Sequence, residues 1–183
     1  LYGGAFQTGS TCEKEFNGEQ LARQGVVVVS IAYRLNVFGF FAHAMLEKEA
    51  VDGRPCANFG FLDQRMGIQW VKDNIALFGG DPANITVFGQ SAGAASALAQ
   101  SVSPMNDGLF QRVIMQSGGG TGLFNRHLWS LEDAQRNGAR FLKYLEVESI
   151  AEARSVPATD LLEAAVTFPA CDWSGQGDDV VWA

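Results

Sequence analysis

One stretch of the sequence has the residue types of a nucleophilic serine site. Residues 85–95 read ITVFGQSAGAA, with Gly89 two residues before Ser91 and Gly93 two residues after it. This G-x-S-x-G spacing is typical of a nucleophile elbow, a sharp strand-to-helix turn that exposes the serine hydroxyl. The flanking residues must be small because the turn brings the strand and helix backbones close together. The spacing therefore predicts acyl-transfer chemistry at Ser91, and an ordinary small-residue turn is the alternative.

Residues 2–6, YGGAF, predict the second half of such a site. Acyl transfer needs backbone N–H donors directed at the oxygen that becomes negative in the tetrahedral intermediate. A glycine-rich loop after a strand can present them, and Ala92, which follows the serine, supplies one more. An isolated Gly-Gly pair indicates an ordinary turn equally well. Beside an elbow, the donor interpretation is favoured.

A base for this serine is hard to find in the sequence. A serine hydroxyl is a weak nucleophile without one, and the chain contains only two histidines, His43 and His127. His43 is expected to lie exposed in a loop. Ser91, Asp107 and His127 follow the chain order of a triad, but Asp107 falls in a turn before a strand and His127 comes soon after that strand. Neither histidine is therefore assigned as the base of Ser91.

The elements that must position these residues alternate between strands and helices. A continuous β-branched run predicts a strand buried on both faces of a parallel sheet, and S-x-x-D and S-x-x-E patterns predict helix starts. The expected strands are 26–32, 85–88 and 112–116, and the expected helices are 61–78, 92–102, 131–145, 150–155 and one capped by Thr159 that ends at Val166. This order is typical of an α/β fold followed by a helical region.

Composition and charge exclude several classes of function. The chain has 47% apolar residues, 18% charged residues and a net charge of −7, and no Lys/Arg cluster that would favour nucleic acid. Its longest apolar stretches are shorter than the roughly 20 residues of a membrane-spanning helix. Cys12, Cys56 and Cys171 are widely spaced and have no histidine at metal-ligand spacing. We therefore expect reduced thiols, without a metal site or a disulfide framework. The lack of a disulfide framework favours a cytoplasmic location.

Several longer stretches resemble the type-B carboxylesterases, the group of para-nitrobenzyl-type esterases, animal carboxylesterases and cholinesterases. Residues 78–93, FGGDPANITVFGQSAG, resemble the serine signature of that family from end to end. Four further stretches resemble sequences of this family: YGGAF at 2–6, YRLNVFGF at 33–40, NFGFLDQR at 58–65 and QSG at 116–118. The resemblance covers nearly all of residues 1–120.

The resemblance implies an α/β-hydrolase fold, with a mostly parallel sheet and helices on both faces. Residues 1–183 would form part of one catalytic domain, with residues 1–120 as its core and 121–183 as a helical insertion region. Both ends of the sequence suggest a longer protein. The strand ending at Leu1 and Tyr2 would lie between strands 26–32 and 85–88. Those two strands would each have an unpaired edge in the isolated chain, which favours aggregation.

The resemblance also implies hydrolysis of a small-molecule carboxylic ester through an acyl-enzyme, with no metal or organic cofactor. Ser91 would be the nucleophile, and Gly4, Ala5 and Ala92 would be the oxyanion donors, with Gly89 and Gly93 supporting the turn. Gln90 stands where cholinesterases have a glutamate, which weakens the case for a cationic choline substrate. The family's Glu or Asp and its His would lie downstream, so the isolated 183 residues are expected to be inactive.

Two alternatives remain within this fold. Some relatives, such as the neuroligins, are adhesion modules that do no chemistry, and intact serine and donor residues argue against that interpretation here. An amide- or peptide-cleaving enzyme would use the same elbow and donors.

Overall fold

A computed structural model describes residues 1–50, 56–118 and 129–168 of the chain. The chain divides into two compact units. The first comprises Leu1–Tyr33 and Gly60–Leu128, and the second comprises Arg34–Phe59 and Trp129–Ala183. The sequence suggested a division near residue 120, whereas residues 34–59 group with the later helices.

The first unit is built around two parallel strands and the helix between them. β1 (Thr86–Gln90) pairs in parallel with β2 (Arg112–Gln116), so that Thr86 lies opposite Arg112 and Gln90 opposite Gln116. α5 (Ala92–Val102) packs against both strands. The strands predicted at 85–88 and 112–116 and the helix predicted at 92–102 are confirmed, with β1 shifted toward Gln90.

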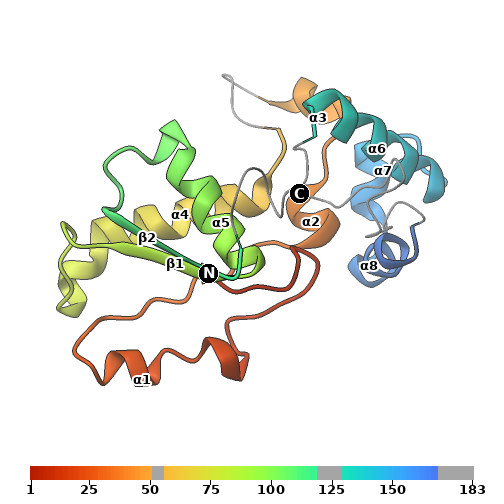
Figure 1. The fold of residues 1–183 in the computed structure, drawn as a ribbon. Helices are drawn as coiled ribbons and strands as arrows, with labels where there is room; N and C mark the ends of the chain where they lie inside the picture. Colours follow the sequence, from red (N-terminus) through yellow and green to blue (C-terminus); the bar gives the residue numbers. More distant parts are fainter. Residues whose placement is uncertain (51–55, 119–128, 169–183) are drawn as a thin grey trace. The chain divides into compact units, whose positions relative to one another are not determined.

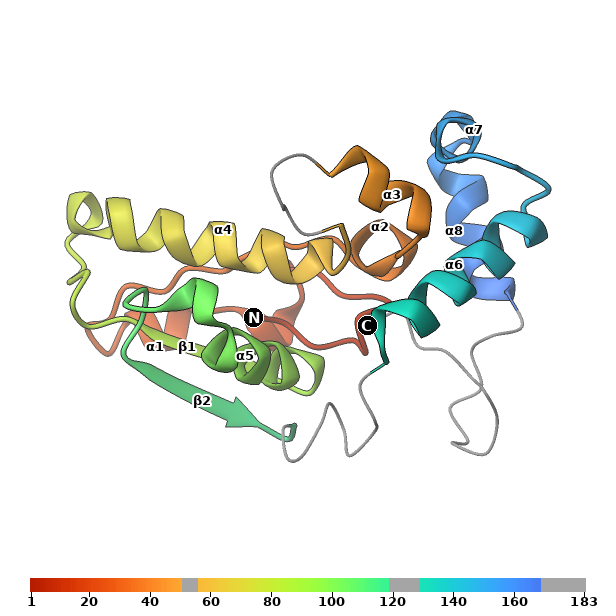
Figure 2. The ribbon, with the colours of Figure 1, turned by 90° about the horizontal axis from the view of Figure 1, so that it is seen from above.

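Further helices surround this sheet. Figure 1 shows α5 on one side of the strands and α1 (Glu19–Ala22) on the other, and Figure 2 shows α4 (Phe59–Asn74) and β2 on opposite sides of β1. α4 continues into η2 (Ile75–Phe78) and ends where Gly79 adopts a φ of 82°, a left-handed conformation that favours glycine. The core joins Ile68, Val87, Ala97 and Leu109. Short 3-10 turns, η1 (Lys14–Phe16) and η3 (Pro104–Asn106), complete the described part of the unit.

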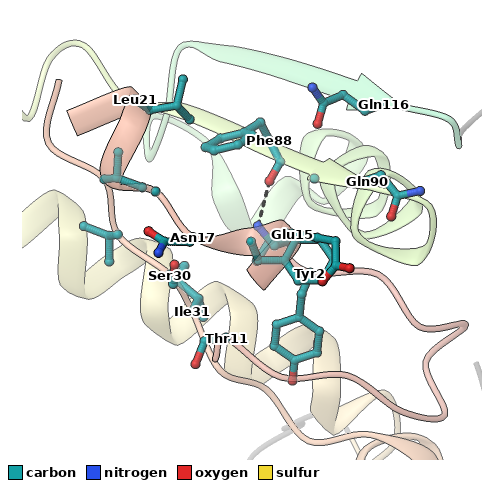
Figure 3. A pocket seen from close by; sticks show the side chains of 16 residues that line it. Tyr2, Thr11, Glu15, Asn17, Leu21, Ser30, Ile31, Phe88, Gln90 and Gln116 are labelled. Atoms are coloured by element: carbon teal, nitrogen blue, oxygen red, sulfur yellow. Dashed lines mark hydrogen bonds between the residues drawn. The ribbon is translucent and has the colours of Figure 1, made fainter. Parts of the chain in front are cut away.

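The strand predicted at residues 26–32 is not formed. The segment is extended, but among the described residues only β1 and β2 make a sheet, and Val26 and Val27 are 53% and 46% exposed. A cavity of about 410 Å³ is lined by Val28 and Ile31 from this segment and by Phe88 from β1 (Figure 3). A β-branched run predicts burial only when neighbouring strands cover it, and here no described strand does.

The backbone of Leu1 lies against the β1 side of this cavity. Its nitrogen donates to the Phe88 carbonyl oxygen at 2.7 Å, the dashed line in Figure 3. On the other edge of the sheet, Ile114 and Met115 of β2 are 52% and 45% exposed. Such apolar, unpaired edges are the physical basis of the aggregation expected for the isolated chain.

The second unit is helical. It contains α2 (Asn36–Phe40), α3 (Ala44–Glu49), α6 (Leu131–Tyr144), α7 (Ile150–Ser155) and α8 (Ala158–Thr167). Part of its core consists of Leu46, Leu142 and Ile150. No helix in the described parts of the chain is long and apolar enough to cross a membrane.

Two of the three predicted helix caps are confirmed. The Ser130 hydroxyl accepts from the Asp133 N–H at 3.1 Å, and the Ser149 hydroxyl accepts from the Glu152 N–H at 3.1 Å. The prediction for Thr159 is wrong, because α8 already begins at Ala158 with Pro157 as its N-cap residue. The Thr159 hydroxyl instead donates to the Asp160 side chain at 2.9 Å.

His43 is not the exposed loop residue that the sequence predicts. It is 8% exposed and caps α3, where its Nδ1 accepts from the Met45 N–H at 3.1 Å. Its ring also stacks on Phe41, with 6.1 Å between the ring centroids. A neutral imidazole can accept at Nδ1, whereas a protonated one cannot.

We expect the free energy of unfolding to fall at low pH because of His43. Burial lowers the pKa of His43 below its ordinary value of 6.5, so the unfolded chain takes up this proton at a higher pH than the folded chain does. The stability is therefore complete above the unfolded pKa and is lost as the pH falls through the lowered folded pKa. Chemical denaturation of the full-length protein at about pH 7.5 and about pH 5.5 measures this loss.

The control is His43→Asn, which keeps a side-chain acceptor at the N-cap but does not titrate. Its free energy of unfolding should change less between the two pH values than that of the wild type. An equal change in both proteins would contradict the assigned role of His43.

Candidate active site

Ser91 lies at the turn between β1 and α5 in a strained backbone conformation. Its φ and ψ are 55° and −121°, a region that costs a non-glycine residue roughly 1–3 kcal/mol. The Ser91 N–H donates to the Gln116 carbonyl of β2 at 2.9 Å, and its carbonyl accepts from the N–H groups of Ala94 and Ala95 at 2.9 and 3.0 Å. The neighbouring strand and the first turn of the helix therefore hold the serine in this conformation.

The glycines that flank Ser91 lie where the backbones come closest. A Cβ atom on Gly89 would lie 2.3 Å from the carbonyl carbon of Gly93. A Cβ atom on Gly93 would lie 2.2 Å from the Leu1 oxygen and 2.7 Å from the Tyr2 oxygen. Backbone atoms cannot move aside as a flexible side chain can, so both positions require glycine.

Replacement of Gly93 by alanine is expected to destabilise the protein. Alanine is normally preferred to glycine inside a helix by about 1 kcal/mol, but here its Cβ would overlap the Leu1 and Tyr2 carbonyls. Overpacking of this kind costs roughly 1–3 kcal/mol. Denaturation midpoints of the full-length protein measure the effect.

The matched control is Gly67→Ala in α4. A Cβ atom there would meet the Cγ2 methyl of Ile31 at 2.6 Å, which belongs to a side chain that can change its rotamer, unlike a backbone carbonyl. We expect a smaller loss of stability than at Gly93. A Gly93→Ala protein as stable as the wild type would show that the helix and the loop do not approach as described.

The loop at residues 2–6 lies directly beside this turn. A Cβ atom on Gly3 would lie 2.8 Å from the Gln90 carbonyl oxygen and 3.2 Å from the Ser91 Cβ. The chain then turns sharply, with a φ of 109° at Gly4 and 57° at Ala5. The structure thus brings together the two motifs that the sequence singles out, which lie far apart along the chain.

Three backbone N–H groups in these two segments have no hydrogen-bond acceptor among the described residues. They belong to Gly4, Ala5 and Ala92. Ala92 is fully buried, and a buried N–H group without an acceptor is rare in proteins. Free donors on two segments that meet beside a serine can bind an oxygen that carries negative charge.

The Ser91 hydroxyl is likewise not hydrogen-bonded to any described residue. Asp107 is exposed in a turn after η3, and His127 lies outside the described residues. The His43 Nδ1 is already used to cap α3. The described residues therefore place an unbonded serine hydroxyl beside backbone N–H groups without acceptors, and no described residue is assigned as a base for this serine.

No set of three or more His, Cys, Asp or Glu side chains in the described ranges could hold a metal ion. Cys12 is exposed and Cys56 is half-buried, and both are free thiols, while Cys171 lies outside the described residues.

Two features of the site have no signal in the sequence pattern. Ser117 has a φ of 54°, and it leads into Gly118, where a Cβ atom would lie 2.5 Å from the Ser91 carbonyl oxygen. Tyr2 and Tyr33 bond each other's backbones, although they lie 31 residues apart. Both features depend on contacts between segments that are distant in the chain.

Comparison with known proteins agrees with this geometry. The sequence profile described as "Carboxylesterase family" matches residues 1–177. The chain belongs to the carboxylesterase family. The chain therefore has the α/β-hydrolase fold of that family, of which the parallel strands and flanking helices described above are a part.

Relatives of this carboxylesterase-family chain include proteins named as esterases. It is 41% identical over 168 residues to para-nitrobenzyl esterase of Bacillus subtilis, covering 90% of this chain and 32% of that protein. It is 41% identical over 138 residues to fumonisin B1 esterase of Sphingopyxis macrogoltabida, covering 75% and 25% of the two chains. A solved carboxylesterase of Geobacillus stearothermophilus superposes with a TM-score of 0.79 at 42% identity, covering 92% of this chain and 36% of that one. The chain thus spans about a third of the length of these relatives or less.

Proposed function

We propose that the full-length protein hydrolyses carboxylic esters through an acyl-enzyme formed on Ser91. The observation that carries this proposal is the strained turn at Ser91, placed against a loop whose free N–H groups can bind an oxyanion. Strain is retained where the surrounding structure enforces it, and such positions cluster at active sites. The names of the relatives, which are esterases, support the same reaction class.

In the proposed reaction, the Ser91 oxygen attacks the carbonyl carbon of the ester while a base takes its proton. The carbonyl oxygen becomes an oxyanion, which accepts hydrogen bonds from the N–H groups of Gly4, Ala5 and Ala92. The tetrahedral intermediate then collapses, the alcohol leaves with the proton from the base, and the acyl group remains on Ser91. Water, activated by the same base, releases the acid and restores the serine.

The base and its acid partner are proposed to come from the part of the protein that follows residue 183. A serine at an elbow needs a histidine within hydrogen-bond reach and an acid that fixes its tautomer. Without both, the 183-residue chain should show no ester hydrolysis above background.

The neutral side chain of Gln90 bears on the choice of substrate. Its Oε1 would lie 2.9 Å from a Cβ atom on Gly3. The amide is therefore next to Ser91 and beside the loop at residues 2–6, which we call the donor loop. An amide offers no full negative charge to attract a cationic alcohol group. We therefore propose a neutral ester as the substrate, rather than a choline ester.

Hydrolysis assays with the full-length protein test this proposal against its alternatives. A p-nitrophenyl ester should be hydrolysed much faster than the matching p-nitroanilide, and an acid-quenched sample should carry the acyl group covalently. Faster cleavage of the anilide would favour an amide-cleaving enzyme. A folded protein that cleaves neither compound would favour a binding module.

A further inference from the structure

Two buried tyrosines, Tyr2 and Tyr33, tie the donor loop to the end of the segment that contains the 26–32 run. The Tyr33 hydroxyl donates to the Tyr2 carbonyl oxygen at 2.7 Å, and the Tyr2 hydroxyl donates to the Tyr33 carbonyl oxygen at 2.9 Å. The Tyr2 hydroxyl also accepts from the Tyr33 N–H at 3.3 Å. Their rings stack, with 4.3 Å between the centroids and 14° between the planes. Each side chain therefore bonds the backbone of the other residue, and we call the two residues the tyrosine pair.

The tyrosine pair is shielded from water. Tyr2 and Tyr33 are 5% and 6% exposed, and burial raises the pKa of both hydroxyls. Both side chains are consequently neutral donors throughout the physiological pH range. Hydrogen bonds in such a low-dielectric environment are strong, and a broken bond cannot be replaced readily by water. The pair is therefore suited to holding backbone atoms in one arrangement.

The Tyr2 carbonyl oxygen, which accepts a hydrogen bond from Tyr33, also lies against α5. A Cβ atom on Gly93 of α5 would lie 2.7 Å from this oxygen. Burial and the neighbouring Tyr2 raise the pKa of Tyr33, and the Ser96 hydroxyl, also on α5, has a smaller opposing effect, so Ser96 is a neighbour of the Tyr33 hydroxyl. The Ser96 hydroxyl is itself held by the Gln64 side chain at 2.9 Å.

Between Tyr2 and Phe6 the loop has few restraints of its own, because the next side chain that anchors it is the Phe6 ring, which is 1% exposed and packs against Phe61 with 5.6 Å between the ring centroids. Gly3 and Gly4 have no side chains, and Gly4 has a φ of 109°. The Gly4 carbonyl accepts from the N–H groups of Gln7 and Thr8, each at 3.0 Å. These bonds close the turn internally, but they do not fix it to the elbow. The Tyr2 carbonyl and the Phe6 ring therefore hold the two ends of the loop, and the Tyr2 carbonyl is the end that lies nearer to Ser91 along the contact with α5.

We propose that Tyr33, acting with Tyr2, is a positioning residue that holds the Gly4 and Ala5 N–H groups in register with Ser91. The proposal rests on the proposed function, because the donors matter to catalysis only if an oxyanion forms there. Oxyanion stabilisation depends on donors that are already aligned, and a misplacement of about 1 Å can cost about 10²-fold in rate. Tyr33 itself does not touch the substrate.

The test is Tyr33→Phe in the full-length enzyme, which removes the hydroxyl and keeps the ring stack. We expect kcat to fall by about 10-fold to 10²-fold with little change in KM. A trifluoromethyl ketone, which forms an oxyanion on addition of the serine, should bind more weakly by the same factor as kcat/KM. Tyr2→Phe, which removes only the opposite hydroxyl, should act in the same direction.

A merely structural role is distinguished by the control Ile68→Val. Ile68 is 2% exposed in the core of the same unit and lies outside residues 2–6, so loss of one buried methylene in this variant should lower the melting temperature and leave the hydrogen bonds of the tyrosine pair in place. Tyr33→Phe should lose kcat and inhibitor affinity, whereas Ile68→Val should keep both. The proposal is overturned if, at similar melting temperatures, the two variants have equal kcat and equal inhibitor affinity.

Hydrogen exchange at Gln7 and Thr8 separates a failure of this proposal from a failure of the proposed function. Their amides close the loop, and they should exchange faster in Tyr33→Phe than in Ile68→Val. A wild type without esterase turnover would refute the proposed function, and with it the catalytic role of the pair. Faster exchange would then still support the tyrosine pair as the anchor of the loop, and unchanged exchange would contradict it.

Discussion

Replacement of Ser91 by alanine in the full-length protein should abolish ester hydrolysis and covalent labelling by a fluorophosphonate together. Removal of the nucleophile from other serine hydrolases lowers kcat by about 10⁶-fold, and we expect a loss of that order. Alanine removes only the hydroxyl, which no described residue bonds, so the fold should not change. Initial rates with a p-nitrophenyl ester and gel-based labelling give the two measurements.

The matched control is Ser101→Ala, near the end of α5, the helix that follows Ser91. The Ser101 hydroxyl is exposed and donates to the Leu98 carbonyl at 2.7 Å, so its removal should leave turnover and labelling intact. Normal labelling of the Ser91→Ala protein would refute the assignment of the nucleophile.

The second large effect is expected from removal of the Ala5 N–H. Loss of one oxyanion donor lowers kcat by roughly 10²–10³-fold in other enzymes. Proline also lacks the N–H, but its ring fixes φ near about −65°, whereas Ala5 has a φ of 57°. Lactic acid in place of Ala5, introduced by nonsense suppression, exchanges the N–H for an ester oxygen and keeps the methyl group. We expect kcat to fall and KM to change little.

Two variants control for the chemistry and the strain. Lactic acid at Ala83, whose N–H donates only to the Asp81 side chain in an exposed turn, should leave kcat near the wild-type value. Ala5→Gly keeps the N–H and relieves the positive φ, so it should retain activity and gain stability. A normal kcat with lactic acid at position 5 would place the donor elsewhere.

Local signals account for the parts of the fold that the sequence predicts well. Helices α6 and α7 begin at serine caps, and α4 and η2 end at a glycine with positive φ, because these features involve only neighbouring residues. The close approach at Gly89 and Gly93 also follows from the geometry of a strand-to-helix turn. Ser91 could therefore be singled out from the residues alone.

Contacts between distant segments account for the features that the sequence did not predict. Residues 26–32 would be buried only if neighbouring strands covered them, and among the described residues no strand pairs with this segment. The position of His43 depends on Phe41 and on a helix start that lacks the usual Ser, Thr, Asp or Asn. The tyrosine pair joins residues that are 31 positions apart, and no periodicity reports such a bond. The φ of 57° at Ala5 is unexpected because alanine rarely adopts it.

The most direct test of Ser91 as the nucleophile is to locate the adduct that a fluorophosphonate forms on the full-length protein. Trypsin cleaves after Lys72 and Arg112, so Ser91 and Ser117 fall in different peptides. Fragmentation of peptide 73–112 should place the adduct on Ser91, in equimolar amount and with parallel loss of ester hydrolysis. The proposed role of Ser91 would be contradicted by an adduct on Ser117 or on a residue outside this chain. It would also be contradicted by full activity after Ser91 is labelled.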